Sequence, residues 1–508
     1  ADGRADVPGL ENLKSEQTYS NGVGNKNDDS KVITDDEFQR RTERLEVWLK
    51  RNGARFHKVT INRYADEGRD LKTKSSLEKG EEAIFIPRKC IIAISDGKRS
   101  KVGQAIRKET SGWISNHTYL AVRILTEKTL GKQSFFYPWL EVLPTDYAEQ
   151  GMPQYWNEKQ RRELEFTKTL GKTDGVLENI HEMWNKIKNV SVVKDSEWTL
   201  EDFKWARFTV LTRTFGCTEH GAAETMMVPL ADMANHDFTR PTRWDYNDKK
   251  TGFTVRVVRD VGKDQMLTDT YGNKGNDSFL PVYGFCVEQN NWNQARLALP
   301  LKNINGLDVP GLDSLHISKC AYDYNDGKHK YIDVSCDTQA SGSSRGGKEL
   351  FSYARAIVLS KPELEALPSL ESNSSLEPIS AENEIRALSL IKEKADVQLK
   401  KFRTTYEEDL EILRDEKQAP KFSWFRNAVL ARSGEKSTMI YYKKLAEATI
   451  PLLKCRSLEE MSSHNMFQKL KSASKKENFG YYAGKYFDQV VHKLVSKKSD
   501  KPETSSKG

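Results

Sequence analysis

The sequence predicts an α+β protein, in which short strands flank a helical region and helices form the C-terminal third. Strand-like apolar runs occur at Val59–Ile61 and Phe253–Val258. Residues 95–215 carry apolar side chains at helical spacing, and a longer apolar stripe extends from Ser380 to Glu416. Because 508 residues are too many for one compact core, we expect two or three domains.

The N-terminal part begins with a polar segment and continues into a helix. Residues 1–33 are rich in Gly, Asn, Asp, Ser and Lys, which predicts disorder. Thr34–Glu37 has the spacing of a capping box, Leu45, Trp48 and Leu49 share one face, and Gly53 ends the predicted helix. The chain starts at Ala1 without methionine, which indicates processing or trimming and leaves any targeting peptide upstream.

Helices are also predicted in the middle and at the C-terminal end. A second capping box, Thr199–Asp202, begins the last helix of the region 95–215. The stripe from Ser380 to Glu416 continues for seven turns and predicts one long helix; more helices follow, which favours a helical domain over a coiled coil. Residues 297–336 read as short strands and turns, and Ser341–Gly347 as a flexible loop.

Composition excludes several classes of function. The net charge of +7 arises from 80 basic and 73 acidic residues, so the surface is mixed and no specific nucleic-acid binding is expected. No run of eighteen apolar residues occurs, so no membrane span is predicted. The six cysteines form no Cys-x-x-Cys pair; we therefore expect free thiols in a reducing compartment and no metal site.

The stretch from Val228 to Phe285 contains the candidate site. Its first apolar run ends in the pair Asn235-His236, and about one hairpin later a predicted strand ends in Tyr271-Gly272. Asn and His can hold a polar ligand through both main chain and side chain. Each motif alone is typical of an ordinary turn or of a core tyrosine. Their combination and order are more specific.

This combination resembles the SET-domain methyltransferases, and within them the branch of the Rubisco large-subunit lysine methyltransferase and the actin-histidine methyltransferase. The resemblance spans roughly residues 35–495. It implies a β-rich SET core with a helical insert, followed by an all-helical substrate-binding domain. The implied segments are a SET domain at 34–300 with its insert at about 97–215, a helical domain at 301–496 and a loose tail at 497–508.

The resemblance also implies a cofactor, S-adenosylmethionine, as methyl donor without a metal. The implied cofactor-binding residues are Glu67, Gly68, Arg69, Asn235, His236, Tyr271 and Phe285, and the implied substrate-binding residues are Arg213, Phe215 and Tyr283. Tyr271 is the implied catalytic residue, whose phenol orients the amine and the migrating methyl group. Asp70 stands where the family usually has a second glycine. A hairpin of charged turns is the alternative for residues 66–88, and a surface salt bridge is the alternative for Arg213.

The implied function is a protein-lysine N-methyltransferase that acts on a non-histone protein. Phe215 and Ala231 resemble the lysine-modifying members, whereas the actin-histidine branch has a polar and a bulky residue there. A protein-histidine methyltransferase is one alternative. A catalytically weak SET-like binding module is another, favoured by Asp70 and opposed by Tyr271. We expect a monomeric intracellular protein, cytoplasmic, nuclear or plastid, with a protein partner and neither membrane nor nucleic acid; its substrate protein and the degree of methylation are left open.

Overall fold

The computed structural model describes residues 35–64, 68–312, 329–335, 345–367, 376–472 and 486–499. Two compact units divide the chain. Unit 1 contains the described residues up to Gly151 together with 187–235 and 241–269, and unit 2 contains 152–186, 236–240 and the described residues from Thr270 onward. Both units are discontinuous in sequence, whereas the predicted domains are continuous segments, so the boundaries of those domains stay a prediction.

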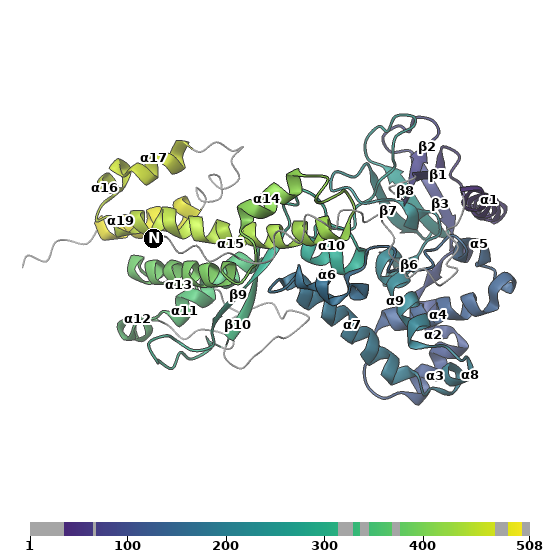
Figure 1. Cartoon of the computed structure of the whole chain (residues 1–508), viewed down its shortest axis with the longest axis horizontal. Coiled ribbons are helices and arrows are strands. Elements are labelled where there is room, and N and C mark those ends of the chain that lie inside the picture. Colours follow the sequence, from purple (N-terminus) through teal and green to yellow (C-terminus); the bar gives the residue numbers. More distant parts are fainter. Residues whose placement is uncertain are drawn as a thin grey trace, which may run out of the picture. The chain divides into compact units, whose positions relative to one another are not determined.

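Unit 1 combines antiparallel sheets with helices (Figure 1). Its strands are β1 (Val59–Tyr64), β2 (Gly68–Thr73), β3 (Glu82–Pro87), β4 (Ile92–Ala93), β5 (Thr214–Glu219), β6 (Ala222–Met227), β7 (Thr242–Asn247) and β8 (Gly252–Val257). The sheets have the strand orders β1-β2, β3-β8-β7 and β4-β6-β5. The helices of unit 1 are α1 (Asp35–Arg51), α2 (Ile94–Arg99), α3 (Lys101–Glu109), α4 (Asn116–Leu130), α5 (Tyr137–Leu140), α8 (Ser191–Asp195) and α9 (Leu200–Arg213).

The local signals in the sequence explain several of these elements. In α1, Leu45 and Leu49 are fully buried, as their shared face predicts. The capping box at Thr199 is confirmed: the Thr199 hydroxyl accepts a hydrogen bond from the Asp202 amide at 3.1 Å, and the Asp202 carboxylate accepts one from the Thr199 amide at 3.0 Å. These two bonds satisfy donors that the first turn of α9 would otherwise leave unpaired.

Unit 2 is mainly helical. Its helices are α6 (Glu158–Arg162), α7 (Lys168–Ile187), α10 (Asn276–Tyr283), α11 (Arg345–Ile357), α12 (Lys361–Glu365), α13 (Ala381–Leu399), α14 (Tyr406–Arg414), α15 (Trp424–Lys454), α16 (Leu458–Ser463), α17 (Asn465–Ser472) and α19 (His492–Ser499). The last residue of α7, Ile187, is counted with unit 1. Strand β9 (Gln294–Pro300) pairs antiparallel with β10 (His329–Ser335). Helices α13 and α15 lie side by side (Figure 1) and bury Leu390, Ile391, Met439 and Tyr442 in one core.

The long C-terminal helix predicted from Ser380 to Glu416 is wrong. The structure divides this stretch into α13 and α14, with residues 400–405 between them. Thr405 starts a new helix because its hydroxyl accepts from the Glu408 amide at 3.2 Å and its own amide donates to the Glu408 carboxylate at 2.7 Å. The apolar spacing continues across this break, so the periodicity concealed it.

Other predictions at the ends of segments have mixed outcomes. The predicted flexible loop at 341–347 is partly wrong, since α11 begins at Arg345, and its first four residues lie outside the described part of the chain. Residues 497–499, predicted to be loose, close α19. The segment 1–33, predicted to be disordered, lies outside the described residues.

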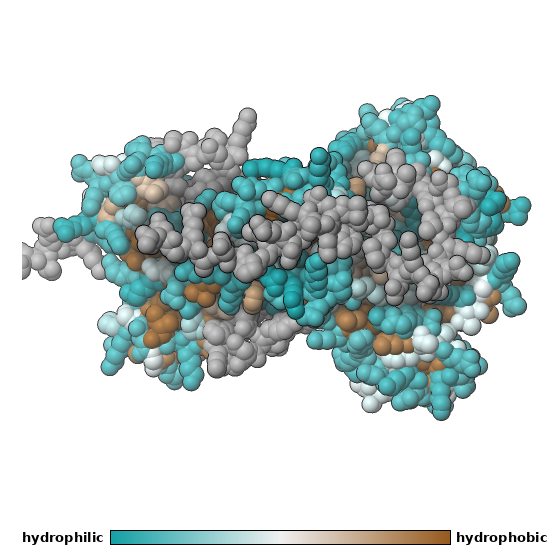
Figure 2. All heavy atoms as spheres, in the orientation of Figure 1, coloured by the Kyte–Doolittle hydropathy of each residue, from teal (hydrophilic) through white to brown (hydrophobic). Residues whose placement is uncertain are grey.

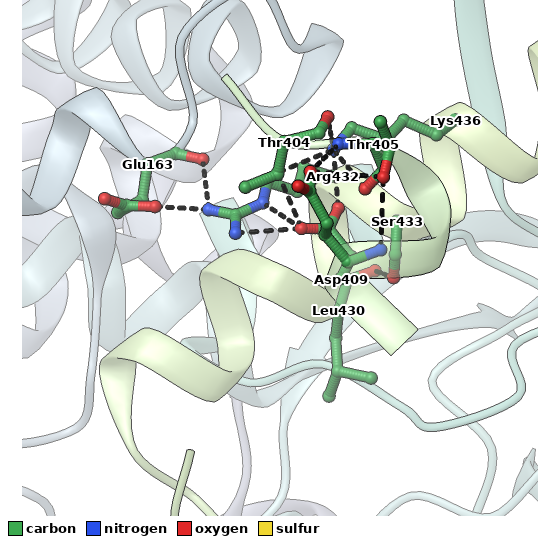
Figure 3. A network of polar contacts seen from close by, with 9 residues as sticks. Glu163, Thr404, Thr405, Asp409, Leu430, Arg432, Ser433 and Lys436 are labelled. Atoms are coloured by element: carbon green, nitrogen blue, oxygen red, sulfur yellow. Dashed lines mark hydrogen bonds and ion pairs between the residues drawn. The ribbon is translucent and has the colours of Figure 1, made fainter. Parts of the chain in front are cut away.

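A buried polar network connects α14 with α15 (Figure 3). The Asp409 carboxylate accepts hydrogen bonds from Lys436 Nζ at 2.6 Å, Arg432 Nε at 2.9 Å and the Thr404 hydroxyl at 2.7 Å. Arg432 also pairs with the Glu163 carboxylate. Buried charges are tolerated when they are paired and hydrogen-bonded in this way. The network therefore fixes the hairpin formed by α14 and α15.

The described part of the chain has a mostly hydrophilic visible face (Figure 2) and free thiols. The visible face is mostly hydrophilic, with hydrophobic residues in small groups (Figure 2). Within the described ranges, no helix has the length and apolar character needed to cross a membrane, and no three or more His, Cys, Asp and Glu side chains gather as a metal site would require. The described cysteines, Cys90, Cys217, Cys286 and Cys455, are free thiols.

Gly434 in α15 lets another segment approach the helix closely, which leads to a stability prediction. A Cβ at this position would lie 2.3 Å from Asn293 Nδ2, and Asn293 Oδ1 accepts the Asn276 amide at the start of α10. We expect Gly434→Ala to lower the free energy of unfolding by about 1–3 kcal/mol, because the added methyl displaces Asn293. Urea denaturation measures this change. The exposed helical control Lys444→Ala is expected to stay within about 0.5 kcal/mol of the wild type, and an equally small change for Gly434→Ala would contradict the close approach.

Candidate active site

Arg69 and Asn235, two of the residues implied to bind the cofactor, meet in unit 1. Gly68 opens β2 with a left-handed φ of +80°, and open space surrounds the position where a Cβ would be. The side-chain amide of Asn235 donates to the carbonyl of Arg69 at 3.2 Å, although 166 residues separate them. The carbonyl of Asn235 accepts the Asp269 amide at 2.9 Å. The structure thus brings Arg69 and Asn235 together, whereas Glu67 lies outside the described residues.

Asp70 does not occupy the backbone conformation that a second glycine would suggest. It lies within β2, opposite Asn62 of β1, and its side chain is buried. The left-handed conformation belongs to Gly68, two residues earlier. Asp70 therefore imposes no left-handed strain at its own position.

Arg213 ends α9 and lies beside Asp232. Its Nη1 donates to the carbonyl of Asp232 at 3.0 Å and lies 3.4 Å from Asp232 Oδ2. Trp139 Nε1 donates to the same carboxylate oxygen at 3.1 Å. Burial raises the pKa of the Asp232 carboxyl, and the Arg213 guanidinium opposes this shift. Arg213 thus has an ion-pair partner, as the alternative reading expected, but the pair is buried rather than on the surface; a role toward substrate stays a prediction.

Phe215 and Ala231 border a common apolar cavity in unit 1. The cavity measures about 10 Å³, which is room for about one water molecule. The Phe215 ring lies 5.3 Å from the Trp244 ring and 5.0 Å from the Phe253 ring, centroid to centroid. The two aromatic neighbours were not expected from the sequence. Trp244 on β7 pairs with Val255 on β8, two residues from Phe253, so the two rings are diagonal neighbours on adjacent strands; this placement is the signal that could have indicated them.

Tyr271 belongs to a cluster of aromatic rings in unit 2. Its ring stacks on Tyr283 at a centroid distance of 4.7 Å and lies 6.3 Å from Phe285. Burial raises the pKa of Tyr283 to about 12, so its phenol stays protonated at neutral pH. We define the aromatic cluster by its members, His236, Phe238, Tyr271, Phe279, Tyr283 and Phe285. Of these residues, the resemblance implies His236, Tyr271, Tyr283 and Phe285, whereas Phe238 and Phe279 are added by the structure.

His236 is held as a neutral imidazole. Burial lowers its pKa to about 4, and its Nδ1 accepts the Tyr271 amide at 3.0 Å. The proton of the neutral ring therefore resides on Nε2. Among the described residues of unit 2, this buried Nε2 has no hydrogen-bond partner. A donor in that position fits an acceptor atom of a polar ligand.

Tyr271 does not end a strand, contrary to the prediction. The segment between Asp269 and α10 is irregular, because the amide of Tyr271 is bonded to the His236 side chain rather than to a neighbouring strand. Tyr283 closes α10, and Phe279 lies four residues earlier, on the same helical face. That spacing is the signal that could have identified Phe279.

The predicted site residues are divided between the two units. Gly68, Arg69, Arg213, Phe215 and Asn235 belong to unit 1. The aromatic cluster, including His236 and Tyr271, belongs to unit 2. That these residues form one methyl-transfer site therefore stays a prediction.

Comparisons with known proteins show which proteins this chain is similar to. A model of the Rubisco LSMT substrate-binding family matches residues 328–439. Actin-histidine N-methyltransferase of Canis lupus familiaris is 24% identical over 451 residues, covering 81% of this chain and 72% of that protein. The protein of the same description from Homo sapiens is 23% identical over 455 residues, covering 81% and 71% respectively.

Solved structures with a similar fold are also found. The SET domain of LSMT bound to lysine and AdoHcy superimposes with a TM-score of 0.65 at 19% identity, covering 85% of this chain and 96% of that one. The chain thus has the fold of the SET domain of LSMT, and over most of its length it is similar in sequence to actin-histidine N-methyltransferases. A further structure, Rubisco LSMT bound to AdoMet, matches with a TM-score of 0.61 at 18% identity over the same shares of the two chains. The fold predicted from the sequence, a SET core with a helical insert and a helical C-terminal domain, is confirmed.

Proposed function

We propose that this SET-domain chain transfers a methyl group from S-adenosylmethionine to a lysine side chain of a protein. The observation that carries the proposal is Tyr271, whose ring lies within the aromatic cluster and whose amide is fixed by His236. Aromatic faces attract cations and offer no competing acceptor, so they suit a sulfonium and an amine stem. The Tyr271 phenol would then be the polar group that orients the amine.

Methyl transfer requires that the donor and the acceptor amine are aligned and that the amine is neutral. S-adenosylmethionine, when bound, supplies an electrophilic methyl group whose sulfur leaves with the electron pair of the broken C–S bond. The amine nitrogen forms the new C–N bond with its own lone pair, so it must first lose a proton. At pH 7 this costs a free lysine roughly 4–5 kcal/mol. An apolar aromatic surround lowers that cost, since it disfavours the charged ammonium.

The geometry around Arg69 and Asn235 supports a role in cofactor binding. Arg69 and Asn235 are joined by a hydrogen bond, so polar groups of these two residues lie together in unit 1. His236 follows Asn235 directly and contributes the buried Nε2 donor described above. We propose that Gly68, Arg69, Asn235 and His236 hold the cofactor and that Phe285 packs against it.

Two observations bear on the acceptor, and they point to different side chains. Phe215 and Ala231 border an apolar cavity. Neither side chain can form a hydrogen bond with the second nitrogen of an imidazole, whereas both can pack against the hydrocarbon stem of a lysine. The pair therefore favours lysine as the acceptor. The relatives described as actin-histidine N-methyltransferases favour histidine instead. We place lysine first because Phe215 and Ala231 are side chains of this chain.

The choice between lysine and histidine can be tested at Phe215. We expect Phe215→Asn to lower the ratio of kcat/KM for lysine to that for histidine acceptors by about tenfold, since an amide removes apolar contact with the lysine stem and adds a partner for imidazole. Paired peptides that differ only in the acceptor residue measure the ratio. Phe215→Leu, which keeps the site apolar, is the matched control and should retain lysine preference. A wild type that methylates only the histidine peptide would establish the second candidate.

Cofactor binding separates an enzyme from a binding module. We expect calorimetric titration of the full chain with S-adenosylmethionine to show one site, weakened about tenfold by Asn235→Ala, because the side-chain amide that holds Arg69 is lost. Absence of binding in the folded wild type would favour a SET-like module that only docks a partner. In either case, we propose that the helical part at 301–496 contacts the protein substrate, in line with the family model that matches 328–439.

A further inference from the structure

The backbone of Tyr271 is held on both sides by side chains. Its amide donates to His236 Nδ1 at 3.0 Å. Its carbonyl accepts a hydrogen bond from Lys274 Nζ, three residues later. The peptide groups before and after Tyr271 are therefore fixed by an imidazole and by an ammonium group, although Tyr271 lies in neither a strand nor a helix.

Lys274 is itself fixed by a group of asparagines in unit 2. The side-chain amide of Asn290 donates to the carbonyl of Lys274 at 2.9 Å and to Asn276 Oδ1 at 3.1 Å. Asn276 exchanges two further bonds with Val287, from its Nδ2 to the Val287 carbonyl at 3.0 Å and from the Val287 amide to its Oδ1 at 2.9 Å. The turn from Tyr271 to Asn276 is thus anchored at its far end.

The Lys274 ammonium lies close to the aromatic cluster. Its Nζ is 6.0 Å from the centroid of the Tyr283 ring, on which Tyr271 stacks. Gly272, at φ +101°, leaves room for it, since a Cβ there would lie 2.9 Å from Lys274 Nζ. Burial, and then the charge of Lys172, lower the pKa of Lys274. Lys172 is paired with Asp277 and Ser278, at 2.6 Å each, and does not share the bond to Tyr271.

We propose that Lys274 is a positioning residue for Tyr271: its ammonium group holds the carbonyl of the catalytic tyrosine and so keeps the phenol in the orientation that methyl transfer requires. This inference rests on the proposed function for its effect on rate, and on the geometry alone for its effect on the backbone. Arginine keeps a cationic donor at this place, whereas methionine keeps the length of the side chain without one.

A double-mutant cycle tests the effect on rate. In the full chain, Lys274→Met is expected to lower kcat about tenfold while KM for S-adenosylmethionine stays within about threefold, and Lys274→Arg to restore part of kcat. In a Tyr271→Phe background, Lys274→Met should lower kcat by less than about twofold, because the two residues act as one unit. Equal losses in both backgrounds would show that Lys274 acts independently of the phenol, and would overturn the proposal.

Hydrogen–deuterium exchange tests the backbone directly and needs no activity. Lys274→Met is expected to accelerate exchange at the Tyr271 and Gly272 amides by about tenfold, since the bond that fixes the peptide is lost. Lys172→Met removes a neighbouring lysine that does not contact Tyr271, and should leave these amides unchanged. Unchanged exchange in Lys274→Met would overturn the positioning role. If the wild type transferred no methyl group but the exchange responded as expected, the proposed function would be wrong, whereas the role of Lys274 in fixing the Tyr271 backbone would be supported.

Discussion

Replacing Tyr271 by phenylalanine is expected to lower kcat for methyl transfer by about 10²–10³-fold, because the phenol orients the amine in the transition state. The affinity for S-adenosylmethionine should stay within about threefold, since the ring keeps its stacking on Tyr283. A methyl-transfer assay with labelled cofactor gives kcat, and calorimetric titration gives the affinity.

The matched control for this change is Tyr353→Phe. Tyr353 also lies in unit 2, and its buried hydroxyl donates to the Pro300 carbonyl at 2.9 Å, away from the aromatic cluster. Its loss should cost about 1 kcal/mol of stability and leave kcat within about twofold. Equal losses of turnover and cofactor binding in Tyr271→Phe would argue against the catalytic role of the phenol.

Asp409→Ala is expected to lower the free energy of unfolding by about 3–5 kcal/mol, because it leaves two buried cations without their shared carboxylate. These cations are Lys436 and Arg432, which the network in Figure 3 joins to Asp409. Urea denaturation followed by circular dichroism measures the change. Since the network belongs to the α14–α15 hairpin, the loss should appear in the transition of unit 2.

An exposed ion pair provides the comparison for this prediction. Glu393 lies 2.9 Å from Lys394 Nζ on α13, with most of its side chain exposed to solvent. Glu393→Ala should change the free energy of unfolding by less than about 1 kcal/mol. If Asp409→Ala were equally mild, the buried network would not support the helices that it joins.

Local signals were sufficient for much of the fold. The capping box at Thr199 placed the start of α9, and the shared face of Leu45 and Leu49 placed α1. The break between α13 and α14 was missed, because the apolar stripe continues through it while the decisive bonds at Thr405 depend on short-range polar geometry. The capping-box spacing Thr405–Glu408 was present in the sequence, but the hydrophobic period outweighed it.

Some residues of the candidate site could be recognised from the sequence, and others could be found only from the fold. Asn235, His236 and Tyr271 were recognisable because their motifs stand in a fixed order along the chain. Lys274 was not, because its bond to the Tyr271 carbonyl depends on the irregular path of the backbone and on Gly272 leaving space beside it. The long-range bond between Arg69 and Asn235 likewise required the fold, since no local pattern relates positions 166 residues apart.

The most direct test is a labelling experiment with the intact protein. The purified full chain is incubated with methyl-tritiated S-adenosylmethionine and an extract of its own cells, and the labelled proteins are digested and sequenced by mass spectrometry. Methyl-lysine in an extract protein, absent when Tyr271→Phe replaces the wild type, is the expected result. Label on histidine alone, or no label despite bound cofactor, would contradict lysine methylation by this chain.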